Sequence, residues 1–331
     1  MLEAFEAFFS NQPKVLDWAI LPIDGGSPYE EEVRRWIAEG KHGSMDFMEQ
    51  TLELRLKPKD WVGSGESLLL FLYDYPTPLT PFNPESNVPQ ISSYSQGRDY
   101  HQEIKSLLYE LQKDLPEELL LKPFADSSPV LERAWVEKAK LGWIGKNTCL
   151  LSRKNGSHFF LGGAFLTKKM ERLGGSNQEF CGGCTLCIDS CPTQAIEAPN
   201  QLNAQKCISY LTIECNGELP IEVWPMLNNQ LYGCDICQQV CPWNKKHLGE
   251  EKAEWVKPNL EWIQLSRKGG GLKSLIKNTA MMRGGRKKFL RNSAILARQN
   301  QEREALDLLR EIALEEDGWL ESQLNSIIDN W

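Results

Sequence analysis

The stretch CGGCTLCIDSCP, at residues 181–192, carries the strongest structural signal in this chain. Its four thiols are separated by two, two and three residues, and a proline follows the last of them. A related stretch, CDICQQVCP at residues 234–242, repeats the end of the pattern and also finishes on a proline. The two stretches hold seven of the 10 cysteines. Their spacing therefore decides what most of the thiols are for.

The spacing is that of bacterial ferredoxins with two 4Fe-4S clusters. One compact loop aims three thiolates at three corners of an iron–sulfur cube, and the cysteine before the proline crosses to the other cluster. We therefore predict one cluster held by Cys181, Cys184, Cys187 and Cys241. The other is predicted to be held by Cys191, Cys207, Cys234 and Cys237. In this set Cys207 replaces the cysteine that a symmetric repeat would have at Leu231.

Two other interpretations of the cysteines stay open. Structural zinc sites also use four cysteines, although they rarely need three in one short loop. Buried free thiols are the second alternative. Cys149 and Cys215 lie outside the pattern, and we expect each to be a small buried side chain.

Length and charge bound the class of protein. The chain has 331 residues and a net charge of −8, which is enough for two or three packed domains. Its longest apolar runs fall far short of the ~20 residues that a membrane-spanning helix needs. The amino terminus, MLEAFEAFFSNQPK, has no cationic start or long apolar core of the kind that begins an export signal. We expect a cytoplasmic protein that does not bind a membrane.

The residues before the cysteines predict a mixed domain, so the expected class is α+β multidomain with an α/β first domain. Apolar periodicity predicts helices over residues 29–39, 99–113 and 129–142, and strands over 68–73, 149–152 and 158–166. Ser27, Pro28 and Glu30 predict a capping box at the start of the first helix.

Residues 266–301 contain ten basic side chains and no acidic one. Positive charge gathered on one part of an acidic protein steers a polyanion to that face, so we predict contacts with RNA or DNA phosphates. A solvated cationic helix face is the alternative. The ten residues are Arg267, Lys268, Lys273, Lys277, Arg283, Arg286, Lys287, Lys288, Arg291 and Arg298. From residue 292 onward the apolar periodicity resembles a HEAT-like helix pair, which must pack on the preceding domain to bury its apolar face.

Four stretches together resemble the cobalamin-dependent epoxyqueuosine reductases, which complete queuosine synthesis in tRNA. They are QGRDYH at 96–101, SPVLERA at 128–134 with LGWIGKN at 141–147, QLNAQKCISYLT at 201–212, and LYGCDICQQVCPWNK at 231–245. The resemblance implies a cobalamin-binding catalytic domain over 1–170, related to reductive dehalogenases. It further implies a two-cluster ferredoxin-like module over 171–250, and a basic, HEAT-like helical domain over 251–331 that contacts tRNA.

The implied reaction is a two-electron removal of oxygen from the epoxide of the wobble nucleoside, which gives an alkene and water. Electrons would come from an external reductase, flavodoxin or ferredoxin. Whether a cobalt–carbon bond forms stays open. Asp126, two residues before the second stretch, matches the family's proposed proton donor. A donor must be protonated near neutral pH, so we expect burial beside the cofactor, away from cations, to raise the pKa of Asp126.

Matching the family residue by residue also suggests which side chains line the cobalamin. The candidates are Arg55, Ser92, Asp126, Leu150, Leu161, Ser209, Cys234 and Asp235. The sequence has no DxHxxG signature, so the resemblance implies base-off cobalamin without a protein histidine on cobalt. Without the family, Asp126 would be interpreted as a turn or cap carboxylate, Arg55 as a surface cation and the leucines as core.

Two other functions compete with this one. A reductive dehalogenase would share cobalamin and both clusters while acting on a small halogenated molecule, but its members usually carry an export signal. A non-catalytic ferredoxin-type electron carrier with an RNA-binding module would leave the amino-terminal domain without a role. For the reductase we expect a monomer.

Overall fold

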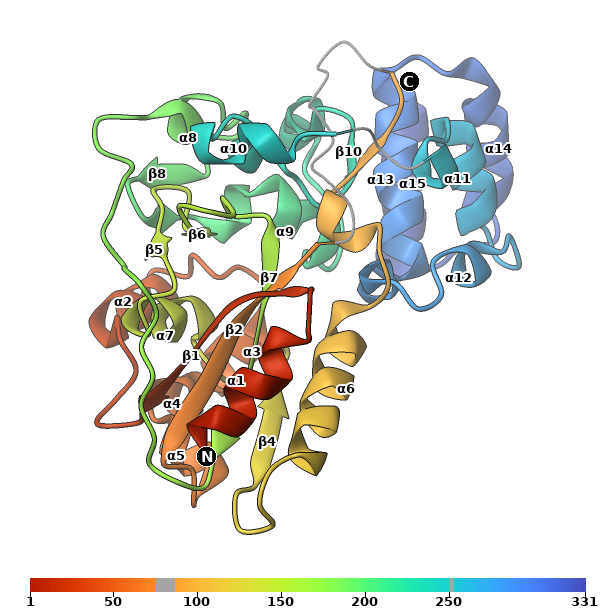
Figure 1. Ribbon diagram of the computed structural model, residues 1–331. Helices are drawn as coiled ribbons and strands as arrows, with labels where there is room; N and C mark the ends of the chain where they lie inside the picture. Colours follow the sequence, from red (N-terminus) through yellow and green to blue (C-terminus); the bar gives the residue numbers. More distant parts are fainter. Residues whose placement is uncertain (76–86, 250–252) are drawn as a thin grey trace.

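The computed structural model describes residues 1–75, 87–249 and 253–331. A four-stranded sheet in the order β1-β2-β7-β4 organises the first domain (Figure 1). Its strands are β1 (Val15–Pro22), β2 (Ser67–Asp74), β4 (Leu121–Phe124) and β7 (Phe159–Leu166). All neighbouring strands run antiparallel, so the expected α/β arrangement is wrong for this sheet. The broader expectation of mixed helix and sheet is confirmed.

Strand β2 is buried on both faces, which is why its sequence is a continuous apolar run. Leu69 and Phe71 belong to the core that includes α1 (Leu2–Ser10) and α6 (Tyr100–Lys113). The alternate residues Leu68 and Leu70 belong to the core on the other face, with Trp135 of α7 (Glu132–Lys138). Successive side chains on a strand point to opposite faces, so one short run supplies both cores.

The Gly162–Gly163 pair of β7 lets the sheet pack closely. A Cβ atom on Gly163 would lie 2.4 Å from the carbonyl oxygen of Leu69. One on Gly162 would lie 2.7 Å from the Phe71 ring. Both distances are shorter than a carbon contact allows, so no larger residue fits here without displacing β2.

The first predicted helix forms as α2 (Glu30–Ala38), but its predicted capping box is wrong. Tyr29 occupies the N-cap position with φ of 63°, and no side chain caps the helix. The Ser27 hydroxyl instead donates to the carbonyl of Arg55, 2.5 Å away. A tertiary partner has therefore replaced the local one.

The other predicted elements differ mainly in length. Helix α6 (Tyr100–Lys113) begins after an N-cap at Asp99, as expected, whereas α7 (Glu132–Lys138) is shorter than the predicted 129–142. The remaining short elements of this part are α3 (Asp46–Gln50), α4 (Leu52–Leu56), α5 (Pro58–Val62), β3 (Gln90–Ile91), η1 (Ser93–Ser95), β5 (Trp143–Ile144) and β6 (Leu150–Leu151).

The cysteine-rich region contains two short helices that pack together, α8 (Leu186–Asp189) and α10 (Ile236–Gln239) (Figure 1). Each begins inside one of the cysteine stretches, as the repeat predicts. Between and after them lie β8 (Ile196–Ala198), β9 (Gln201–Leu202), η2 (Ala204–Lys206), α9 (Ile208–Ile213), η3 (Ile221–Leu227), β10 (Gln230–Tyr232) and η4 (Pro242–His247).

Helices form the carboxy-terminal part. They are η5 (Ala253–Trp255), α11 (Asn259–Ser266), α12 (Leu272–Leu275), η6 (Ala280–Arg283), α13 (Gly285–Gln299), α14 (Arg303–Ala313) and α15 (Gly318–Asp329). One hydrophobic core joins Leu211 and Trp224 to Trp262 and Phe289, so the core is continuous across the boundary predicted after residue 250. In the ranges that the structure describes, no helix is long and apolar enough to cross a membrane.

Candidate active site

The structure brings together the thiols that we assigned to the first cluster. The thiols of Cys181 and Cys187 both act electrostatically on Cys241, although Cys241 comes from the second cysteine stretch. Burial, reinforced by these neighbouring thiols, raises the pKa of Cys241 to about 11. Burial likewise raises the pKa of Cys187, which faces Cys181 and Cys184. The predicted crossing of a cysteine from one stretch to the other group is therefore present in the fold.

The thiols assigned to the second cluster also converge. Cys234 lies near Cys207 and Cys191, and burial raises its pKa above the ordinary value for a thiol. Cys237 lies near Cys234 and Cys207. In the described ranges, no three His, Cys, Asp or Glu side chains are placed to hold a single metal ion.

The two remaining cysteines have different surroundings. Cys149 shares a hydrogen bond with Cys237, which places a ninth thiol beside the second group. The carbonyl oxygen of Cys215 accepts a hydrogen bond of 3.0 Å from Arg291. Sequence spacing gave no sign that Cys149 lies beside the second group, because β6 brings it there through the tertiary fold.

A cleft of about 340 Å³ lies between the first domain and the cysteine-rich region, and it contains Asp126. Its walls are largely aromatic and apolar, with Tyr94, Tyr100, Tyr210 and Ile213 among the lining residues. Cys207 and Ser209 lie on the same walls, so a predicted cluster ligand and the predicted acid share one cleft.

Asp126 has three partners on its Oδ2 atom. The Tyr100 hydroxyl donates to it from 3.1 Å, His101 Nε2 lies 3.1 Å away, and Arg283 Nη1 lies 3.4 Å away. His101 Nδ1 lies 2.6 Å from a carboxylate oxygen of Asp99. An imidazole between two carboxylates donates at both nitrogens only in its doubly protonated form.

This geometry corrects the expected pKa of Asp126. Burial acts to raise it, but the hydrogen bond and charge of His101, the positive charge of Arg283 and the hydrogen bond from Tyr100 outweigh burial, so the pKa of Asp126 is lowered. Solvent also reaches 53% of its side chain. The expectation failed because Arg283 comes from a segment 157 residues away.

Glu132 is a functional candidate that the sequence interpretation missed. Its Oε1 atom accepts a hydrogen bond of 2.6 Å from the backbone nitrogen of Asp126. Burial, together with the nearby Asp126 charge, raises the pKa of Glu132 to about 8. Arg55 is buried beside the same loop and donates to the carbonyls of Ser128 and Val130 over 3.4 Å each. Arg55 is therefore not the surface cation that its sequence context alone suggested.

The other cofactor candidates occupy two places. Ser92 and Asp235 are buried and paired with each other, with the Ser92 hydroxyl donating to the carboxylate. Burial raises the pKa of Asp235 even though Ser92 and Ser93 donate to it. Leu150 and Leu161 belong to the core on the α7 face of the sheet.

Arg291 contradicts its predicted contact with phosphate. The side chain is fully buried and donates to the carbonyls of Leu211, Cys215 and Gly217 over 2.6, 3.0 and 2.8 Å. Arg286 is likewise engaged in an ion pair of 2.7 Å with Glu316, whose side chain is 1% exposed. The sequence window ended before the acidic residues that neutralise part of its charge.

The remaining basic residues divide by exposure. Lys287 pairs with Asp317, Lys288 donates to the carbonyl of Ile213, and Arg298 donates to that of Asn330. Lys268 is exposed and donates to the carbonyl of Glu315. Exposed side chains on the segment that ends with η6 thus remain available to a polyanion; they are Arg267, Lys268, Lys273, Lys277 and Arg283.

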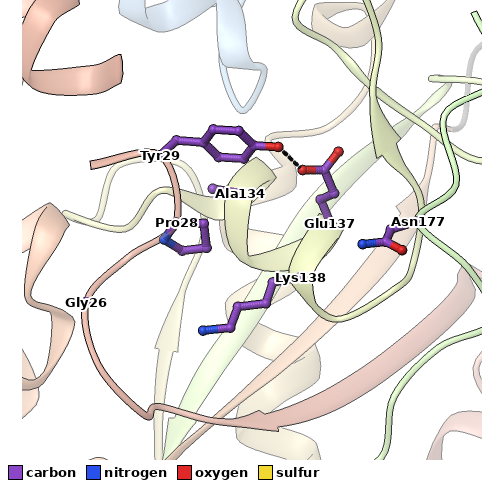
Figure 2. Close-up of a pocket in the computed structure, with 7 residues that line it drawn as sticks. All are labelled: Gly26, Pro28, Tyr29, Ala134, Glu137, Lys138 and Asn177. Atoms are coloured by element: carbon purple, nitrogen blue, oxygen red, sulfur yellow. Dashed lines mark hydrogen bonds between the residues drawn. The ribbon is translucent and has the colours of Figure 1, made fainter. Parts of the chain in front are cut away.

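A second pocket lies between the start of α2 and α7 (Figure 2). Figure 2 shows the Tyr29 hydroxyl donating to the Glu137 carboxylate at its edge. Lys138 and Asn177 also line it, and it contains none of the predicted site residues. We therefore take the Asp126 cleft as the candidate active site.

Two family descriptions match parts of the chain. The description "Epoxyqueuosine reductase QueG, DUF1730" matches residues 55–127, which include Arg55, His101 and Asp126. The description "4Fe-4S double cluster binding domain" matches residues 180–244, which include both cysteine stretches.

Relatives and solved structures carry the same name. The chain is 37% identical to an epoxyqueuosine reductase from Cyclobacterium marinum over 74% of its own length and 84% of the relative. It is 41% identical to one from Pseudomonas aeruginosa over 66% of its length, a match that spans only 62% of that relative. A crystal structure of epoxyqueuosine reductase with an epoxyqueuosine-modified tRNA-Tyr stem loop is 26% identical, with a TM-score of 0.86 over 99% of this chain and 88% of that one. This chain belongs to the epoxyqueuosine reductase family of oxidoreductases.

Proposed function

We propose that this protein removes the epoxide oxygen of epoxyqueuosine in tRNA and thereby forms queuosine. The observation that carries the proposal is the cleft in which Asp126, Arg283 and Cys207 meet, because it joins an acid, a cation and a predicted cluster ligand. The reaction consumes two electrons and two protons and releases water. A tRNA substrate would assign the enzyme to the cytoplasm.

Two 4Fe-4S clusters fit the thiols of this chain. Each predicted set of four cysteines converges from both cysteine stretches, and a cluster needs four thiolates around one cube. Cys181, Cys184, Cys187 and Cys241 would hold one cluster. Cys191, Cys207, Cys234 and Cys237 would hold the other, on the side that faces the cleft through Cys207.

Cobalamin fits the chemistry of the cleft walls. A flat macrocycle needs broad apolar faces, which Tyr94, Tyr100 and Ile213 offer, and the Ser209 hydroxyl lines the same cleft. The cleft is open, so a ligand larger than its 340 Å³ extends beyond the described walls. When bound, reduced cobalamin supplies the electron chemistry that breaks a carbon–oxygen bond. The fold relation to reductive dehalogenases and base-off binding without a histidine on cobalt belong to the same proposal.

Asp126 would deliver the proton to the epoxide oxygen. Its Oδ2 atom already lies within 3.1 Å of Tyr100 Oη and His101 Nε2, so a proton spent on substrate is replaced along a hydrogen bond. Asp99 orients His101 and favours its protonated form. Because the pKa of Asp126 is lowered, the protonated acid is a minor species at neutral pH and the rate should rise as pH falls.

The exposed cations of the carboxy-terminal part would contact tRNA phosphates. Arg283 joins this surface to the cleft, because it lines the cleft while 44% of its side chain stays exposed. Helices α13, α14 and α15 would form the HEAT-like unit behind it. Phosphate contacts predict binding that weakens steeply as salt rises.

One experiment tests the proposal directly. Anaerobically reconstituted protein with cobalamin is incubated with epoxyqueuosine-containing tRNA and a strong chemical reductant, and the nucleosides are analysed by mass. We expect the modified nucleoside to lose one oxygen atom only when cobalamin and both clusters are present. Full conversion by protein whose thiols hold zinc would contradict the proposal.

A further inference from the structure

The loop that carries the first thiol group reaches the surface of the protein. Gly182, Gly183 and Thr185 are exposed, and Leu186 of α8 is 45% exposed. Phe180, just before the loop, packs edge-on against Trp243 with ring centroids 5.9 Å apart. A cluster held by this loop would therefore lie close beneath a partly apolar surface.

Five basic side chains surround this loop, and we call them the basic rim. They are Lys146, Arg153, Lys154, Lys245 and Lys246. Lys146 Nζ donates to the carbonyls of Gly182 and Cys184, over 2.6 and 2.9 Å. Arg153 lies over the Phe180 ring, 4.8 Å from its centroid. The rim is thus assembled from β5–β6 neighbours and the segment after Cys241.

The rest of the rim is tied to the same place. Lys245 and Lys246 lie in η4, which begins directly after Cys241, and Lys246 donates to the backbone carbonyl of Lys154. Lys154 and Lys245 are exposed, and neither side chain has a hydrogen-bond or ion-pair partner among the described residues. These two charges are therefore free to act on something outside the chain.

Only part of this positive charge is balanced nearby. The Glu179 carboxylate accepts from the backbone nitrogen of Cys181, and the Asp189 carboxylate accepts from the Thr185 hydroxyl over 2.7 Å. Both acids remain exposed, so the surface around the loop has five cations and two anions. A locally positive patch on a chain with a net charge of −8 attracts an acidic partner to one face.

The rim lies apart from the surface proposed for tRNA. Figure 1 places α8 and α10 on the opposite side of the molecule from α11 to α14, with α9 and β10 between them. Arg283 approaches Asp126 from the carboxy-terminal side. A partner seated on the rim would leave the Asp126 cleft open, which favours a protein that delivers electrons over a second RNA contact.

We propose that the basic rim, with Leu186 at its centre, docks a small acidic protein that donates single electrons to the cluster held by Cys181, Cys184, Cys187 and Cys241. This inference rests on the proposed function, because it requires a cluster at those thiols. In each encounter the donor is oxidised by one electron and the cluster is reduced by one, so two encounters supply one epoxide.

The test reverses the two unpartnered charges of the rim. Lys154→Glu with Lys245→Glu keeps the contacts of Lys146, Arg153 and Lys246 that hold the loop. Reduced flavodoxin serves as the acidic donor, and the bleaching of cluster absorbance is followed by stopped flow. We expect the second-order rate to fall roughly tenfold or more at low salt, and the difference to disappear at high salt.

Two controls separate the possible causes. Dithionite, which needs no docking surface, should reduce the clusters of variant and wild type at equal rates. Lys273→Glu with Lys277→Glu makes the same charge change on the far surface, and it should leave reduction by flavodoxin unchanged while weakening tRNA stem-loop binding.

Three results decide the matter. Equal flavodoxin rates for the rim variant and wild type at low salt would overturn the proposal, as would a rim variant that loses only tRNA affinity. Salt-dependent binding of oxidised flavodoxin that the rim variant loses would support it without any turnover. A wild type that accepts electrons at the rim yet leaves the epoxide intact would refute the proposed function and keep the docking surface.

Discussion

Replacing Arg283 with glutamine tests how the site controls its acid. The guanidinium Nη1 lies 3.4 Å from Asp126 Oδ2, and both side chains are about half exposed, so the water value of the dielectric applies. At that distance Coulomb's law gives about 1.2 kcal/mol, which corresponds to roughly 0.9 pH unit. Arg283 lowers the pKa of Asp126, so its removal raises that pKa. If Asp126 donates the proton, the fall in rate with rising pH should shift upward by about one unit.

The assay is the single-turnover rate of epoxide loss at saturating enzyme, measured from about pH 4 to pH 9 at low salt, a range that covers ordinary carboxyl and imidazole titration. Saturation removes the effect of Arg283 on tRNA affinity. Lys277→Gln is the matched control, because it removes one exposed cation of the same segment that is not among the groups shifting the pKa of Asp126. A midpoint that stays in place, or moves to lower pH, would refute the role of Asp126 as the acid.

Three further outcomes are expected. Asp126→Asn should keep the iron content and lower single-turnover rate by roughly 10²–10⁴-fold, the usual contribution of a positioned acid. Arg291→Met should lower the free energy of unfolding in urea by roughly 3–5 kcal/mol, because buried carbonyls lose their donor, whereas Arg298→Met at the surface should cost under about 1 kcal/mol. Burial raises the pKa of Glu132 from 4.5 to about 8, so its contribution to stability is complete below pH 4.5 and is lost as pH rises through 8. Glu132→Gln should therefore unfold at a higher temperature than wild type above pH 8, and a difference that does not grow between pH 5 and 8 would contradict this.

Local patterns predicted the elements whose stability is local. The run at residues 68–73 and the helix at 99–113 appear as β2 and α6, because burial periodicity and the Asp99 cap are written in neighbouring residues. The direction of the strands was not predicted, since an apolar run buried on both faces is the same in parallel and antiparallel sheets. The capping box failed because Ser27 found a partner in Arg55, 28 residues along the chain.

The site was predicted where covalent spacing fixes geometry. The cysteine pairing across the two stretches follows from short loops, and the thiols of Cys181, Cys187 and Cys241 do meet. The surroundings of Asp126 depend on long-range packing, which brings Arg283 to it and places Glu132 beneath it. The QGRDYH motif held a usable signal, because an Asp-x-His pair at a helix start suits a carboxylate–imidazole pair, and this is the pair seen between Asp99 and His101.

The bonds of α13 fix how the protein can move. Arg291 and Asn292 together donate to carbonyls on both chain segments that lead to the second thiol group, at residues 211–217 and at Leu231. A swing of the carboxy-terminal helices would have to break all of these bonds at once, so the RNA platform and the redox module turn as one piece. The anticodon loop must then deform to reach the acid, and a chain cut after residue 249 would expose a bare half-core instead of yielding a smaller enzyme.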